Sequence, residues 1–134
     1  MSDQPMRPSD TDELVWSPDQ MIARLGGDEE LAGQLVTLFI GECPRMMAHV
    51  RESVEQGAPD VVRRAAHAFK GSVSNFTTGG PAVTALVLET MGRDGRLDEA
   101  AATLSRLEQE VDVLLSQLRA FEAAFARRAS PRAE

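Results

Sequence analysis

Apolar residues recur at every third or fourth position along most of this 134-residue chain. The pattern is clearest near the C-terminus, where it includes Leu97, Leu104, Leu107, Val111, Leu114, Leu115, Leu118 and Phe121. This spacing places apolar side chains along one side of a helix, as in the helices of a bundle. No segment shows the alternation of apolar and polar residues that is typical of a half-buried strand. The sequence therefore predicts an all-α protein.

Helix-start and helix-stop residues divide the pattern into five helical segments. A short first helix begins at the Ser-Pro pair 17–18 and ends at the Gly pair 26–27. A long second helix covers about residues 28–57, and we expect Pro44 to kink or break it. Three more helices are expected over about residues 59–76, 83–91 and 97–125. Four substantial helices with short links predict an up-and-down four-helix bundle, with the short helix as an N-terminal addition.

The predicted bundle lies between two polar ends. Residues 1–15 and 127–134 are rich in polar residues and contain prolines, so we expect a flexible N-terminal arm and a flexible C-terminal tail. Residues 16–126 contain the helical pattern and form the bundle. A chain of this length suits a single domain.

Charge and cysteine content argue against several classes of function. The chain has a formal net charge of −7 and a sequence pI of about 4.8, whereas nucleic-acid-binding proteins usually show a basic patch. The single Cys43 cannot form an internal disulfide, and no His or Cys cluster has the spacing of metal ligands. The chain also shows neither a long apolar run nor a charged-then-apolar leader. We therefore expect a cytoplasmic monomer that binds neither nucleic acid nor membrane and holds no metal.

His67, in the predicted third helix, is the strongest candidate for chemistry. In a helical projection at about 100° per residue, Phe69, Val73 and Phe76 share the apolar face of this helix. His67 projects from nearly the opposite side, so we expect an exposed imidazole on a rigid element. At neutral pH an unperturbed imidazole keeps a free lone pair on one ring nitrogen, which makes it a nucleophile that needs no base.

The neighbours of His67 on the helix suit phosphoryl chemistry. Lys70, three positions later, can reach phosphoryl oxygens on the imidazole and offset their charge. Gly71 follows at four positions, where a glycine costs about 0.8–1.0 kcal/mol relative to alanine. We interpret this glycine as room for a partner to approach the helix closely. Arg63 and Arg64, one turn earlier, add positive charge to the same face.

The segment HAFKGSVSNF at residues 67–76 resembles the signature of histidine phosphotransfer (HPt) domains, with Phe69 in place of the usual leucine. The resemblance covers about residues 17–120 and includes GGDEEL at 26–31, RRAA at 63–66, LE at 88–89 and the closing leucine-rich helix. In one departure, Thr77 and Thr78 precede the glycine that usually follows the signature soon after. This departure leaves open where the third helix ends.

The resemblance implies a phosphorelay carrier in a two-component system. His67 would accept a phosphoryl group from a receiver-domain aspartate and pass it to another receiver aspartate. Lys70 would steady the phosphoryl group and Gly71 would give the receiver room to dock, with Arg64 and Ser74 as supporting residues. The implied partners are response-regulator receiver domains and a hybrid histidine kinase. The chain would need no cofactor of its own, because Mg²⁺ would come from the receiver.

Glu89 lies at a position where the family often has a polar residue that hydrogen-bonds the imidazole. Its carboxylate would orient the ring by accepting a hydrogen bond from it, although its charge would also disfavour a phosphoryl group nearby. An ordinary solvated helix residue fits the position equally well.

Two other functions compete with the phosphorelay carrier. A non-catalytic binding module would use the same surface to sequester a response regulator or an enzyme, but the intact set of His67, Lys70 and Gly71 argues against a degenerate copy. The dimerising histidine domain of a sensor kinase would have an acidic residue and a proline after the histidine, which this chain lacks. No phosphate-binding loop, paired catalytic carboxylates or nucleophilic triad is found, so we expect no ATP site and no enzyme activity. His49 and Cys43 lack comparable neighbours and are interpreted as packing or surface residues.

Overall fold

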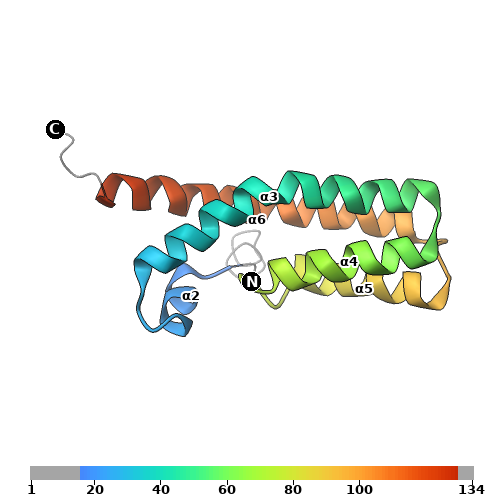
Figure 1. Cartoon of the computed structure of the whole chain (residues 1–134), viewed down its shortest axis with the longest axis horizontal. Helices are drawn as coiled ribbons and strands as arrows, with labels where there is room; N and C mark the ends of the chain where they lie inside the picture. The colour runs from blue at the N-terminus through green and yellow to red at the C-terminus, as the bar shows by residue number, and fades with distance from the viewer. Residues whose placement is uncertain (1–15, 130–134) are drawn as a thin grey trace, which may run out of the picture.

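The computed structural model describes residues 16–129. This part of the chain forms only helices, in the order α2 (Pro18–Arg24), α3 (Glu29–Gln56), α4 (Pro59–Val73), α5 (Pro81–Asp94) and α6 (Ala100–Ala129). The four longer helices run side by side along the long axis of the molecule (Figure 1). The most extensive packing is between α4 and α5, and α3 contacts both α4 and α6, which closes the bundle. The predicted all-α, four-helix architecture with a short N-terminal helix is confirmed.

Local sequence signals account for most helix boundaries. The Ser17 side chain accepts a hydrogen bond from the Gln20 backbone N–H at 3.2 Å and caps α2. Asp28 caps α3 in the same way, accepting from the Leu31 N–H at 2.9 Å. At the other end of α3, Gly57 has a φ of 67°, a left-handed conformation that glycine adopts at little cost.

Of the two outcomes predicted for Pro44, a kink or a break, the break does not occur. The helix continues without interruption from Glu29 to Gln56 with Pro44 inside it. A proline removes one backbone hydrogen bond from a helix interior, but α3 packs against both α4 and α6, and the residue before the proline, Cys43, is buried. Figure 1 shows that α3 changes direction along its length while it remains one helix.

The other helix ends differ from the prediction by a few residues. The helix α4 ends at Val73, and a tight turn follows in which the Phe76 N–H donates to the Val73 carbonyl at 2.9 Å. The helix α5 is longer than predicted at both ends, and α6 begins three residues later and extends to Ala129. Residues 127–129, predicted to belong to a flexible tail, are therefore helical, and Arg128 forms an ion pair with Glu29 of α3. The predicted arm at 1–15 and residues 130–134 lie outside the described part of the chain.

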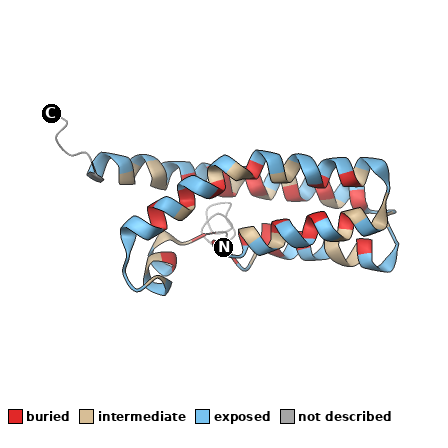
Figure 2. Cartoon of the chain, viewed as in Figure 1, coloured by how far each residue is buried: buried red, intermediate tan, exposed pale blue. Residues whose placement is uncertain are grey.

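The core lies between the four long helices and is almost entirely apolar (Figure 2). Phe69 on α4 is fully buried, and its ring centroid lies 6.3 Å from that of Phe39 on α3. Burial of one phenylalanine side chain contributes about 1.5–3 kcal/mol. Because Phe69 faces the core, the residues on the opposite side of α4 face solvent.

The helix α5 approaches α4 closely at Gly92. A Cβ atom at this position would lie 2.5 Å from the Arg63 backbone nitrogen and 2.6 Å from the Pro59 carbonyl oxygen. Only glycine permits this separation of the two backbones without displacement. The close approach lies one helical turn beyond Glu89 on α5.

Candidate functional site

His67 lies on the solvent side of α4. Its side chain is 64% exposed, while the neighbouring Ala66 and Phe69 are fully buried. The buried neighbours fix the rotation of α4 about its axis, so the imidazole points away from the core. The helical projection from the sequence thus gives the orientation that the structure has.

The side chain of Glu89 on α5 joins His67 and Lys70 into one cluster. Its Oε2 atom lies 3.0 Å from Nδ1 of His67, and its Oε1 atom lies 2.9 Å from Nζ of Lys70. The carboxylate is only 16% exposed, and the Lys70 side chain is 28% exposed. Oε1 is buried and has no hydrogen-bond partner, so its contact with the Lys70 ammonium is an ion pair only.

The cluster keeps Glu89 ionised. Burial by itself would raise the pKa of the Glu89 carboxyl, but the contacts with Lys70 and His67 outweigh burial and lower the pKa below its usual value of 4.5. A charged carboxylate is a hydrogen-bond acceptor only. Nδ1 of His67 is therefore the donor to Glu89, and in the neutral form of the imidazole the lone pair lies on Nε2.

Lys70 is the only lysine in the chain, and the other 13 of its 14 basic residues are arginines. Lysine presents a compact ammonium group with three donors on a flexible stem, whereas arginine presents a planar fork suited to one bidentate partner. The cation beside His67 is thus the type that can turn between two acceptors.

The surface above Gly71 is open. A Cβ atom built at this residue meets no other atom within 4 Å, and the residue is exposed. Packing within the described chain therefore does not explain a glycine inside this helix.

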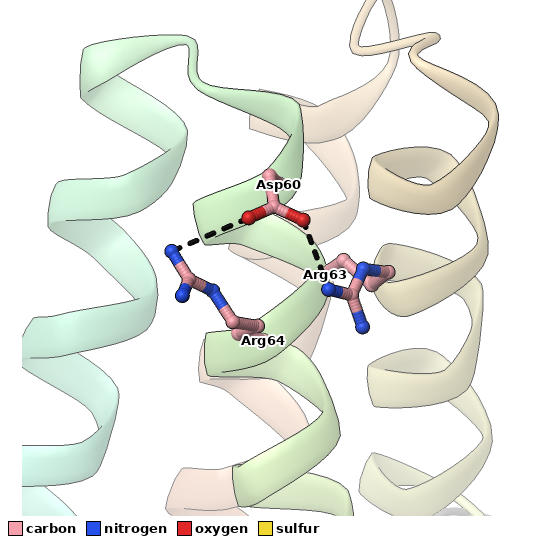
Figure 3. Close-up of polar contacts among 3 residues, drawn as sticks. All are labelled: Asp60, Arg63 and Arg64. Carbon is pink, nitrogen blue, oxygen red and sulfur yellow. Dashed lines mark hydrogen bonds and ion pairs between the residues drawn. The ribbon is translucent and has the colours of Figure 1, made fainter.

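Arg63 and Arg64 share a single carboxylate (Figure 3). Arg63 Nη2 lies 2.9 Å from Oδ1 of Asp60, and Arg64 Nη2 lies 3.3 Å from Oδ2 of the same residue. The hydrogen bond from Arg63, together with the charge of Arg64, lowers the pKa of Asp60. The positive charge that the sequence predicts on this face is thus partly offset by Asp60. Ser74, the other supporting residue, is exposed at the C-terminal cap of α4.

A groove lies between α3 and the C-terminal end of α4. It is lined mainly by side chains of α3, together with one residue of α4 and two of the turn that follows α4, namely Leu35, Leu38, Phe39, Glu42, Arg45, Met46, Ser72, Asn75 and Phe76. Leu38 is 60% exposed, the largest value among the exposed large hydrophobic residues of the described chain. The sequence alone does not indicate this groove, because the residues on its two sides, at 35–46 and 72–76, are far apart along the chain.

The other candidate residues lie away from this cluster. His49 is exposed on α3, and Cys43 is buried, which raises the pKa of its thiol to about 11. Within residues 16–129, no group of His, Cys, Asp and Glu side chains is arranged to hold a metal ion. None of the described helices combines the length and apolar character needed to cross a membrane.

The fold and the site define a class of protein: a four-helix bundle that presents one solvent-facing histidine, with a lysine and a carboxylate held beside it. A model of the Hpt domain family matches residues 34–120, which include this whole cluster. The chain belongs to the Hpt domain family. Hpt domains are the histidine phosphotransfer modules of two-component phosphorelays. No curated protein and no solved structure matched the chain.

Sequence reasoning named every member of the cluster but missed one of its contacts. It assigned Lys70 to the phosphoryl group and Glu89 to the imidazole, whereas the two side chains form an ion pair with each other. They lie on different helices and 19 positions apart, so no local spacing signals the contact. Only the packing of α5 on α4 brings them together.

Proposed function

We propose that His67 is the phosphoacceptor of a phosphorelay carrier. Its Nε2 lone pair attacks the phosphorus atom of a receiver-domain aspartyl phosphate. A bond from Nε2 to phosphorus forms, the bond from phosphorus to the aspartate oxygen breaks, and its electron pair returns to the aspartate carboxylate. The reverse reaction passes the phosphoryl group to a second receiver. The contact of Nδ1 with Glu89 is the observation that carries this proposal, because it assigns the proton of the neutral ring to Nδ1 and the lone pair to Nε2, on a side chain that is 64% exposed.

Lys70 and Gly71 serve this reaction in different ways. The Lys70 ammonium is one helical turn from His67, where it offsets charge on the phosphoryl oxygens in the transition state. Gly71 leaves the surface open beside the imidazole, so that the receiver can bring its aspartate within bonding distance. Arg64 and Ser74, both exposed, would contribute to the rim of the docking surface.

The receiver docks over α4, with contacts on both sides of His67. The groove between α3 and α4 offers an apolar strip that includes the exposed Leu38. On the other side, Leu86 of α5 is 46% exposed and lies one turn before Glu89. Such a surface suits a transient interface of modest size, which a carrier needs if it is to leave one partner for the next.

The partners supply the remaining chemistry. The receiver domain brings Mg²⁺ and the aspartate, and a hybrid histidine kinase is the source of the phosphoryl group. We propose that the chain itself acts as a monomeric, cytoplasmic carrier rather than as an enzyme, and that its contribution is a nucleophile and a neighbouring charge.

A phosphotransfer assay tests the assignment of His67. Receiver domains encoded in the same genome are phosphorylated with radiolabelled acetyl phosphate and mixed with wild type, His67→Gln or His49→Gln. We expect label on wild type and His49→Gln, and no label above background on His67→Gln. His49 is the matched control because it is an exposed histidine on a helix of the same bundle.

Each other outcome has a definite meaning. Label that survives on His67→Gln would exclude His67 as the acceptor. Absence of label on folded wild type with every receiver would overturn the carrier function. If His67→Gln loses the label but still binds and inhibits its partner, the result favours the alternative function, in which the surface sequesters a regulator or an enzyme.

A further inference from the structure

The carboxylate of Glu89 contacts both the imidazole of His67 and the ammonium of Lys70, the two groups that phosphorylation of His67 would affect. Oε2 lies 3.0 Å from Nδ1 of the imidazole, and Oε1 lies 2.9 Å from the ammonium of Lys70. A neutral amide at this position would make similar contacts without a charge. The question is what the negative charge adds to the chemistry of the phosphorylated histidine.

We propose that the charge of Glu89 makes phospho-His67 a short-lived intermediate suited to immediate onward transfer rather than storage. The inference rests on the proposed function of His67. It has two parts: Glu89 keeps the proton on Nδ1 while Nε2 carries the phosphoryl group, and Glu89 competes with that phosphoryl group for Lys70.

The first part follows from the geometry at Nδ1. When the Nε2 lone pair forms the bond to phosphorus, the proton on Nδ1 stays in place and the ring becomes cationic. Loss of that proton would leave the Nδ1 lone pair facing Oε2 at 3.0 Å, whereas its retention gives a charge-assisted hydrogen bond. The mostly buried position of the carboxylate strengthens this preference.

The retained proton decides how well the ring leaves. When the bond between Nε2 and phosphorus breaks, its electron pair goes to Nε2. A ring that still has the Nδ1 proton then departs as neutral imidazole, whereas a deprotonated ring would depart as an imidazolate anion, which is far less stable. Glu89 therefore favours transfer to an acceptor, and by the same argument it favours hydrolysis.

The second part follows from the position of Lys70. Its ammonium is already paired with a buried carboxylate oxygen that has no hydrogen-bond partner. Full transfer of Lys70 to the phosphoryl group would leave that oxygen without its cation. Lys70, the only lysine of the chain, can share its three donors between both acceptors. A shared cation stabilises phospho-His67 less than a free one would.

Other charged groups near the cluster are already paired. On α4, Arg63 and Arg64 share Asp60. On α5, Arg93 pairs with the adjacent Asp94. On α3, Glu42 and Arg45 line the groove beside α4 and form an ion pair with each other. Glu89 and Lys70 are therefore the charges that respond when His67 is phosphorylated.

The decisive experiment compares wild type with Glu89→Gln, after both are phosphorylated with phosphoramidate and separated from it. Loss of the phosphoryl group is followed by phosphorus NMR between about pH 6 and pH 9. We expect the wild-type rate to change little over this range. The variant, whose amide lacks the charge, should lose the phosphoryl group about tenfold more slowly at the alkaline end, which corresponds to a tenfold lower fraction of protonated rings. Glu122→Gln, on the remote helix α6, is the control and should behave as wild type.

Two further measurements separate this role from a merely structural one. Nitrogen NMR of isotope-labelled histidine should show Nδ1 of phospho-His67 still protonated in wild type at the alkaline end of the range, with His49 as the internal reference. Isotope-labelled lysine gives a single Nζ signal, from Lys70, which should shift on phosphorylation. Both measurements use wild type, so they hold even if Glu89→Gln does not fold.

The outcomes distinguish the inference from the function beneath it. If wild type is phosphorylated on His67 but Glu89→Gln shows the same lifetime and the same pH profile, the role of the charge is wrong and the carrier function stands. A deprotonated Nδ1 in wild-type phospho-His67, or an unmoved Lys70 signal, overturns the first or the second part respectively. If His67 accepts no phosphoryl group from phosphoramidate or from any receiver, the carrier function fails and the inference fails with it.

Discussion

The two histidines of this chain occupy similar places in the fold and have very different surroundings. Both are exposed, and both lie inside long helices of the same bundle, His49 on α3 and His67 on α4. His67 contacts a carboxylate that is also paired with a lysine. Within the described residues, the side chain of His49 has no hydrogen-bond or ion-pair partner. Exposure on a helix is therefore not what distinguishes the candidate acceptor.

The difference comes from the neighbouring helix. Glu89 reaches His67 because α5 lies close to α4, and this approach depends on Gly92, one turn beyond Glu89. The imidazole is thus supplied by one helix, while the group that sets its tautomer is supplied by another. If this comparison is correct, changes that separate α4 from α5 should affect His67 and leave His49 as it is.

Gly92→Ala should have the largest effect on the fold. The added methyl group would lie 2.5 Å from the Arg63 backbone nitrogen, so the helices must move apart. Overpacking of this kind typically costs about 1–3 kcal/mol in the free energy of unfolding, which urea denaturation measures. The control is Gly41→Ala on α3, where the added atom meets nothing within 4 Å, so that stability should rise slightly. Equal stability of the two variants would show that the close approach does not constrain α5.

Lys70→Gln should have the largest effect on transfer short of removing His67. The variant loses the only lysine, so both the phosphoryl group and Glu89 lose their cation. We expect transfer from a phosphorylated receiver to slow by about ten- to a hundredfold, since loss of one charge-stabilising donor in an enclosed enzyme site costs about 10²–10³ and Lys70 is partly exposed. Lys70→Arg keeps the charge and should recover part of the rate. A rate unchanged in Lys70→Gln would exclude a role for this cation in the reaction.

The sequence predicted the residues of the cluster better than it predicted their contacts. The apolar period along α4 was sufficient to orient His67, because burial of Phe69 and Val73 leaves only one direction for the imidazole. The pairing of Glu89 with Lys70 depends on the distance between α4 and α5. That distance depends in turn on Gly92, where the two backbones meet. A local pattern contains no information on this distance.

Pro44 shows the same limit for the fold. The loss of a backbone hydrogen bond at this proline predicts a kink or a break. The helix α3 nevertheless continues through Pro44, because its packing on other helices outweighs that loss. The helix ends at Ser17, Asp28 and Gly57 were predictable because caps and glycine terminators act locally. In contrast, the extension of α6 to Ala129 was not predicted, and there Arg128 forms an ion pair with Glu29 of α3 that no local pattern indicates.

Gly71→Gln should have the smallest effect of these variants, and it tests whether the open surface beside His67 is used. A Cβ atom at this position meets no neighbouring group within 4 Å, and glutamine is a better helix former than glycine, so the free energy of unfolding should rise by up to about 1 kcal/mol. Transfer from the receiver should nevertheless slow several-fold, because the side chain occupies space that the partner needs. Gly41→Gln, an equally exposed and open helix position on α3, should gain stability without losing transfer rate. Transfer as fast in Gly71→Gln as in Gly41→Gln would mean that the receiver does not approach over this part of α4, and that the glycine beside the imidazole has no part in docking.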